Sequence, residues 1–175
     1  MIKTAFFLIS ALFIGTANAN TWTFNYSGGG VSASGSFMTA GSAFTPELVS
    51  NFTGTYTDSF VNNAAITGLV SLGADPHWLY DNKFTAVDPL LNRLGILFGV
   101  VGLGSNVNIF FNDGTNHIPS DFGQYLSGTY VGGRYQLQSV NLVVSAVPEP
   151  EIYAMLLAGL GLFGFMACRR KNLDA

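Results

Sequence analysis

The side chains best suited to acid–base or metal chemistry in this sequence are two histidines and a few scattered carboxylates. Asp75, His77 and Asp81 lie close together, and imidazole combined with carboxylates is a common ligand set for transition metals. His77 and His117 lack the i, i+2 or i, i+4 spacing that brings two imidazoles onto one ion. The sequence therefore predicts no metal site and no cofactor.

Nucleophilic and glycosidic catalysis are equally poorly supported. His117 lies near Asp113 and Asp121 and serines are abundant, but no Gly-x-Ser-x-Gly elbow is present. Glycoside hydrolysis needs two carboxyl groups that face each other, and Glu47 is the only glutamate between residues 20 and 146. We expect no catalytic residues, and an exported hydrolase is the least favoured interpretation.

Aromatic side chains in a polar loop indicate a different chemistry. Trp78 and Tyr80 lie in the stretch HWLYDN, where an aromatic face can stack on the C–H patches of a sugar and a polar tip can reach its rim. Trp22 and Tyr135 fall in strand-like sequence, where core packing is the expected role. Trp78 and Tyr80 are therefore candidate glycan contacts.

The elements that would position these residues are predicted to be short β-strands. Between Asn20 and Ala146, apolar residues alternate with polar ones in runs that end at Gly, Asn, Asp or Ser. Strands are expected at 22–26, 31–37, 48–56, 65–72, 95–101, 107–111, 129–137 and 140–146, with a long loop at 75–92. In the third strand Leu48, Phe52 and Tyr56 share the apolar face. This pattern predicts an all-β domain, namely an antiparallel, jelly-roll-like β-sandwich, with a small barrel as second choice.

Composition and the N-terminus indicate an exported protein. The first nineteen residues combine Lys3, an apolar run and the small-x-small site Ala17-Asn18-Ala19, which is the pattern of a cleaved signal peptide at 1–19. The exported domain at 20–146 has no disulfide, since Cys168 is the only cysteine. A net charge of −3 offers no basic stripe, so nucleic acid is excluded as a partner.

The segment from Val147 to Lys171 has three parts. Pro148 and Pro150 fix φ and remove two backbone donors, so the domain ends there. Residues 152–168 contain no charge and would measure about 25 Å as a helix, the short end of what spans a bilayer. A basic stop at 169–171 follows, which the positive-inside rule keeps in the cytoplasm. The pattern predicts one C-terminal transmembrane helix at 152–168.

Pro148, Glu149 and Pro150, followed by the apolar segment and by Arg169, Arg170 and Lys171, resemble the PEP-CTERM sorting signal. The same ending is also catalogued as the C-terminal domain of some ice-binding proteins. Proteins that carry it come from Gram-negative bacteria and are similar in having a signal peptide and a cysteine-poor, β-rich exported region. The resemblance implies processing by an exosortase, a membrane-embedded cysteine transpeptidase that recognises the Pro-Glu-Pro site. It also implies association with extracellular polysaccharide or biofilm matrix.

The sequence thus predicts a non-enzymatic exported protein sorted by its C-terminal segment. Its expected partners are an exosortase-like enzyme, the inner membrane as a temporary anchor, and extracellular polysaccharide. Before processing, the chain is expected in the inner membrane with its C-terminus in the cytoplasm, and afterwards at the cell surface or in the matrix. The alternative function is a glycan-binding module that uses Trp78 and Tyr80.

Overall fold

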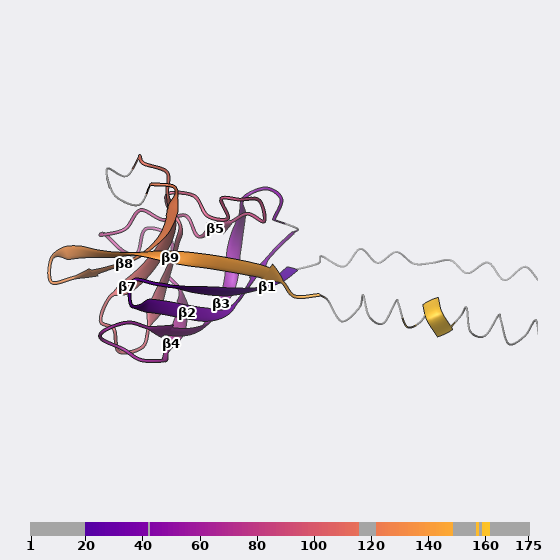
Figure 1. Cartoon of the computed structure of the whole chain (residues 1–175), viewed down its shortest axis with the longest axis horizontal. Coiled ribbons are helices and arrows are strands. Elements are labelled where there is room, and N and C mark those ends of the chain that lie inside the picture. Colours follow the sequence, from indigo (N-terminus) through magenta and orange to yellow (C-terminus); the bar gives the residue numbers. More distant parts are fainter. Residues whose placement is uncertain (1–19, 42, 116–121, 149–156, 158, 162–175) are drawn as a thin grey trace, which may run out of the picture.

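The computed structural model of the chain describes residues 20–41, 43–115, 122–148, 157 and 159–161 (Figure 1). These residues form nine strands whose neighbours all run antiparallel. The strands are β1 (Asn20–Gly28), β2 (Val31–Thr39), β3 (Glu47–Thr57), β4 (Ala64–Leu69), β5 (Lys83–Phe84), β6 (Ile96–Val100), β7 (Asn106–Asn112), β8 (Gln124–Val131) and β9 (Arg134–Ala146).

Eight of these strands close into a barrel. The order is β2-β1-β9-β8-β7-β6-β4-β3, and β3 pairs back with β2, so the sheet has no free edge within this ring. The short strand β5 is added beside β3. The all-β prediction is confirmed, whereas the jelly-roll-like sandwich is corrected to a closed barrel. The β2–β3 pairing is the reason, because it joins the first and last strands of this series, whereas each sheet of a sandwich keeps two open edges.

The side-chain alternation of β3 also differs from the sequence prediction. Leu48 is exposed and its neighbour Val49 is buried, although Phe52 and Tyr56 are buried as expected. The register between β2 and β3 shifts between Ser36 and Met38, and Asn51 opposite this shift has a φ of +49°. This bulge inserts one extra residue and exchanges the two faces of the strand on its N-terminal side.

A second difference lies in the predicted strand 129–137, which is a hairpin. Gly132 and Gly133 have φ values of +60° and +79° and form the two-residue turn between β8 and β9. Paired positive-φ residues are what a two-residue β-turn of this kind requires. Residues 134–146 are then one continuous strand, β9, which pairs first with β8 and then with β1.

The barrel interior is apolar at one end and polar at the other. At the apolar end the rings of Phe24 and Phe52 are stacked with centroids 4.6 Å apart, and Phe37 meets Phe84 edge-on at 4.9 Å. Burying each such ring stabilises the fold by about 1.5–3 kcal/mol. At the other end the interior carries hydroxyl groups, with Tyr26 Oη 3.4 Å from Ser127 Oγ.

The apolar end is also the end at which the chain enters and leaves the barrel (Figure 1). β1 begins and β9 ends there, and the amide of Val147 donates a hydrogen bond to the carbonyl of Thr21 at 2.8 Å. Every strand pairing described lies between Asn20 and Ala146, so residues 20–147 hold a complete barrel with its own core.

Several predicted features lie outside the described residues. These are the signal peptide with Ala17 and Ala19, His117, Asp121, Glu149, Pro150, most of 152–168, and the basic residues Arg169, Arg170 and Lys171. In the part of the chain that the structure describes, no helix is long and apolar enough to cross a membrane.

Candidate functional site

A loop between β4 and β6 covers the outer face of the barrel and carries the predicted contact residues. Asn82 fixes the loop to β6, since its side-chain amide donates to the carbonyl of Val70 at 2.9 Å and its Oδ1 accepts from the amide of Leu97 at 2.8 Å. The amide of Val70 in turn donates to the carbonyl of Leu97 at 2.9 Å. One buried asparagine therefore holds both ends of the segment 70–82 against the same strand.

Tyr80 and Asp75 shape this loop from within. The hydroxyl of Tyr80 accepts from the amide of Ala74 at 3.1 Å and donates to the carbonyl of Ser71. The carboxylate of Asp75 accepts from the amide of His77 at 2.8 Å and from the side chain of Asn106 at 2.7 Å. The polar tip of Tyr80 is thus engaged in holding the loop, and Tyr80 does not line the cavity next to it.

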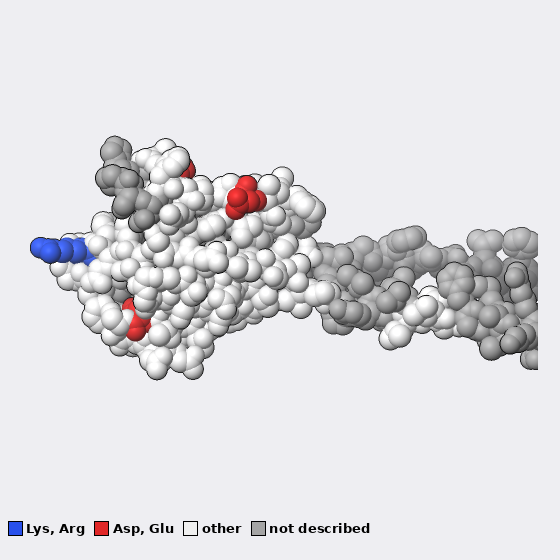
Figure 2. Space-filling model, viewed as in Figure 1, with Lys and Arg blue, Asp and Glu red and all other residues white. Residues whose placement is uncertain are grey.

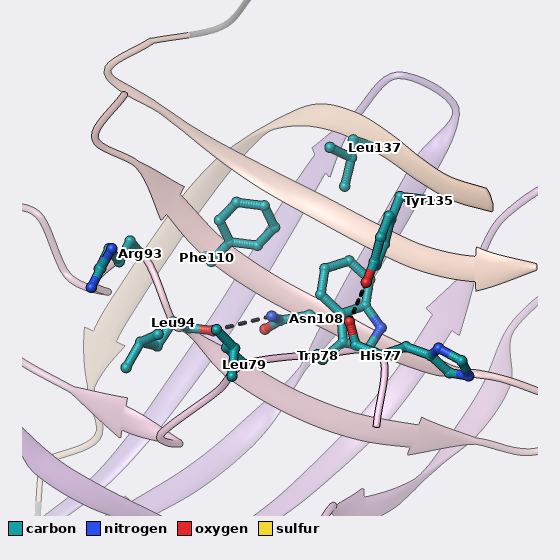
Figure 3. A pocket seen from close by; sticks show the side chains of 9 residues that line it. All are labelled: His77, Trp78, Leu79, Arg93, Leu94, Asn108, Phe110, Tyr135 and Leu137. Carbon is teal, nitrogen blue, oxygen red and sulfur yellow. Dashed lines mark hydrogen bonds between the residues drawn. The ribbon is translucent and has the colours of Figure 1, made fainter. Parts of the chain in front are cut away.

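That cavity has a volume of about 320 Å³ and lies between the loop and the outer faces of β7 and β9 (Figure 3). Its volume is at the lower end of the range for ligand pockets, which is about 300–1,000 Å³. The walls are largely apolar, and they come from segments far apart in the sequence. The lining residues are His77, Trp78, Leu79, Arg93, Leu94, Asn108, Phe110, Tyr135 and Leu137.

Aromatic rings form one side of the cavity. Trp78 and Tyr135 meet edge-on, with ring centroids 4.9 Å apart and planes at 70°. The rings of His77 and Tyr130 are stacked with centroids 3.9 Å apart. The hydroxyl of Tyr135 donates to the carbonyl of His77 (Figure 3). Tyr135 is nevertheless 51% exposed, so part of its ring faces solvent at the rim.

Gly128 on β8 makes room for the indole. A Cβ at this position would lie 2.6 Å from Cη2 of Trp78 and 2.6 Å from Cδ2 of Leu137, which is closer than real side chains approach. The absence of a side chain at residue 128 lets the indole of Trp78 pack closely against β8. Trp78 is consequently half-buried, although the loop that carries it runs over the surface.

Two buried polar atoms of this site have no hydrogen-bond partner among the described residues. They are Nε1 of Trp78, a donor, and Oδ1 of Asn108, an acceptor. Asn108 is 1% exposed, and its Nδ2 donates to the carbonyl of Leu94 at 3.0 Å, which fixes the direction of its Oδ1. An unpaired buried group costs about 1–3 kcal/mol, so a ligand that satisfies both atoms would recover that energy.

Three of the carboxylates considered for metal or acid–base chemistry, those of Asp75, Asp81 and Asp113, are engaged in other hydrogen bonds. Asp81 accepts from Asn92 Nδ2 at 2.8 Å, and Asp75 is used as described above. The hydroxyl of Thr115, at 2.6 Å, and its amide lower the pKa of Asp113. Among the described residues, no three His, Cys, Asp or Glu side chains gather where they could hold a metal ion.

Of the two predicted glycan contacts, Trp78 lines the cavity and Tyr80 does not, and most of the other lining residues were not predicted. Tyr135 was expected in the core and instead lies at the cavity, whereas Trp22 packs as expected, 5.0 Å from Phe84. The signal for Tyr135 was the Gly132-Gly133 turn, which places it opposite Tyr130. Asn108 gave no local signal, because an asparagine in an apolar run also fits a strand that faces solvent.

Comparison with known proteins adds information on the C-terminus. Residues 146–171 match the family described as the PEP-CTERM protein-sorting motif, which confirms the resemblance seen at Pro148, Glu149 and Pro150. No curated protein and no solved structure gives a significant match to the chain. The motif marks an exported protein that transits the membrane and is sorted by an exosortase.

Proposed function

We propose that this exported, exosortase-sorted protein is a non-enzymatic polysaccharide-binding protein of the cell surface or extracellular matrix. Its sorting motif supports delivery to the envelope, and residues 152–168 would serve as a temporary anchor in the inner membrane with the C-terminus in the cytoplasm. After processing, the barrel would associate with exopolysaccharide or biofilm matrix through the outer cavity.

The observation that carries this proposal is the pairing of an exposed aromatic rim with two unpaired buried polar atoms. Trp78 and Tyr135 offer ring faces and edges to the apolar side of a pyranose. Nε1 of Trp78 and Oδ1 of Asn108 offer one donor and one acceptor, which a sugar hydroxyl can satisfy because it both donates and accepts. A purely apolar ligand would leave both atoms unpaired.

The surface charge supports a neutral or weakly charged ligand. On the face shown in Figure 2, charged side chains are few and isolated, and they form no basic stripe. Of the cavity-lining residues, Arg93 and His77 carry basic groups, and Arg93 Nη1 donates to Thr115 Oγ1 at 3.4 Å.

Binding of residues 20–147 to exopolysaccharide purified from the host tests the proposal. We expect saturable binding, and we expect Trp78→Ala to weaken it about tenfold, equivalent to about 1.4 kcal/mol for the lost ring contact and N–H donor. Gly128→Ala should weaken binding similarly by displacing the indole. Trp22→Phe is the matched control, since the Trp22 N–H pairs with Thr39 Oγ1 at 3.0 Å, away from the cavity.

Two results would contradict the proposal. If the folded wild-type domain did not bind the polysaccharide, the protein would be interpreted as a matrix protein without a glycan-binding role. Cleavage of the polysaccharide that is lost on His77→Ala or His117→Ala would show an exported hydrolase instead.

A further inference from the structure

The hairpin that forms one wall of the outer cavity has a second face inside the barrel. Side chains alternate along β8 and β9, so Gly128, Tyr135 and Leu137 face the cavity outside. The residues between them face the barrel mouth, and cross-strand pairing joins Thr129 to Gln136 and Ser127 to Gln138. One hairpin therefore presents an aromatic face outward and a polar face inward.

The mouth is a hollow of about 270 Å³ at the end of the barrel opposite to Asn20 and Ala146. The turn between β1 and β2 borders it on one side, and the end of β3 with the following turn borders it on another. Its lining residues are Gly29, Gly30, Val31, Tyr56, Asp58, Ser59, Phe60, Ser127, Thr129, Gln136 and Gln138. Barrel mouths are frequent positions for small-molecule sites.

The carboxylate of Asp58 is held in a fixed orientation at this mouth. Oδ1 accepts from the amides of Phe60 and Val61 at 2.7 and 2.9 Å, and Oδ2 accepts from the hydroxyl of Tyr56 at 3.3 Å. Each carboxylate oxygen can accept two hydrogen bonds, so Oδ2 keeps one acceptor position. A preorganised acceptor of this kind costs little entropy when a ligand hydroxyl binds.

Both hydrogen-bond donors and hydrogen-bond acceptors are available around Asp58. Among the described residues, none hydrogen-bonds to the side-chain amides of Gln136 and Gln138 or to the hydroxyl of Thr129, although Thr129 is only 6% exposed. Phe60 lies at the edge of the hollow and is 59% exposed, which is unusual for a phenylalanine beside so many polar groups. Its ring provides an apolar face next to the donors and acceptors.

We propose that this mouth is a second binding site, separate from the outer cavity, for a neutral, hydroxyl-rich ligand such as a single sugar residue. The two amides and the hydroxyl of Thr129 can both donate and accept, which matches sugar hydroxyls. The carboxylate of Asp58 would repel an anionic ligand. As the one carboxylate among the lining residues, it does not supply enough ligands for a calcium ion. The polar lining excludes an acyl chain. With both sites occupied, one domain would connect two polysaccharide segments, a consequence that rests on the proposed function.

The test is an NMR titration of ¹⁵N-labelled residues 20–147 with D-glucose, D-galactose and N-acetyl-D-glucosamine. Side-chain NH₂ signals of Gln136 and Gln138 report on the mouth, and the indole N–H of Trp78 reports on the outer cavity. The indole of Trp22, bonded to Thr39 at the other end, is the internal control. We expect the two glutamine signals to shift in a saturable manner with at least one of the three sugars, while Trp22 stays unchanged.

Variants establish the site. Phe60→Ala should weaken the glutamine response at least fivefold without changing the response of Trp78. Gln136→Ala should weaken the response of the Gln138 signal similarly, and this variant should also fold because Gln136 is exposed. Phe44→Ala, with a phenylalanine that is 72% exposed outside the mouth, is the matched control and should have no effect.

The outcomes separate the two proposals. Shifts at Trp78 without shifts at the glutamines would overturn the second site and leave the outer cavity standing. Shifts at the glutamines alone would support the mouth and count against the outer cavity. No response of the glutamines to any of the three sugars, or a response that survives both Phe60→Ala and Gln136→Ala, overturns the inference.

Discussion

Tyr26 is fully buried at the boundary between the apolar and polar halves of the barrel. Burial raises the pKa of its hydroxyl well above the usual value of 10.0, and the hydrogen bond with Ser127 offsets this only in part. Burial raises the pKa of Tyr125 to about 12 in the same way, and the nearby carboxylate of Asp88 adds to the effect. The barrel therefore keeps these phenols protonated at a pH at which an unfolded chain would lose the protons.

The stability of the barrel should fall as the pH rises above about 10. In that range Tyr26 loses its proton in the unfolded chain but keeps it in the folded barrel. Through this residue alone, each further pH unit lowers the free energy of unfolding by about 1.4 kcal/mol. Below pH 10 the contribution is constant. Urea denaturation at pH 9, 10 and 11 measures the slope, and Tyr26→Phe should reduce it by that amount. An unchanged slope in Tyr26→Phe would mean that the hydroxyl ionises within the fold.

At the scale of strands, closure of the barrel depends on a pair of glycines. Gly35 on β2 and Gly54 on β3 lie directly opposite each other in the pairing that joins the two ends of the sheet. A Cβ on Gly35 would collide with the carbonyl oxygen of Thr53 and lie 2.8 Å from Cα of Gly54, and Gly54 itself has a φ of +151°. The two backbones approach so closely because neither residue has a side chain.

Gly35→Ala should therefore open this seam and destabilise the barrel. We expect a loss of about 1–3 kcal/mol in the free energy of unfolding, the usual cost of forcing an extra group into a packed site. Urea denaturation at neutral pH measures it. Ser34→Ala, an exposed neighbour on the same strand, is the control and should change stability by less than about 0.5 kcal/mol. Equal stability of the two variants would show that the strands can separate here without cost.

The strands themselves could be predicted from the sequence, but their arrangement could not. Glycine turns and alternation located β1, β2 and β6, because both signals are local. The choice between barrel and sandwich depended on the pairing of Gly35 with Gly54, and the face of Leu48 depended on the bulge at Asn51. Neither has a local signature, since a bulge is defined by the partner strand.

The candidate site also has one part that local sequence could predict and another that depends on how the strands pair. Trp78 could be predicted because an aromatic residue in a polar loop is unusual for a core position. Its partners Asn108 and Tyr135 come from β7 and β9, which reach the loop only when the barrel closes. The barrel mouth could not be predicted, because Asp58 and Gln138 are eighty positions apart and look like ordinary surface residues.

At the scale of the whole molecule, the sorting segment begins directly where the barrel ends. β9 stops at Ala146, and Pro148 follows after one residue that is still bonded to Thr21. A processing enzyme could thus reach the sorting segment without unfolding the domain, because β9 has already ended at Ala146 and Pro148 lies outside the sheet. The folded barrel would pass through sorting intact.

The intact mass of the protein should consequently depend on the exosortase. We expect protein from wild-type cells to begin at Asn20 and to lack the residues that follow the Pro-Glu-Pro segment, whereas cells without the enzyme should keep them. Mass spectrometry of the purified protein measures both ends. The N-terminus, cleaved by a different enzyme, is the control and should be the same in both strains. A retained C-terminal segment in both strains would contradict sorting by this route.

The long strand β9 links the two ends of the barrel, and it determines how the domain would respond to a pulling force. Over thirteen residues it pairs with β8 along its first half and with β1 along its second. If a polymer pulls at the mouth while the chain is held at Pro148, tension runs lengthwise through this strand. The hydrogen bonds on both flanks would then be sheared together, rather than peeled apart one at a time. If the domain binds polysaccharide as proposed, this topology would help it to resist a pulling polymer.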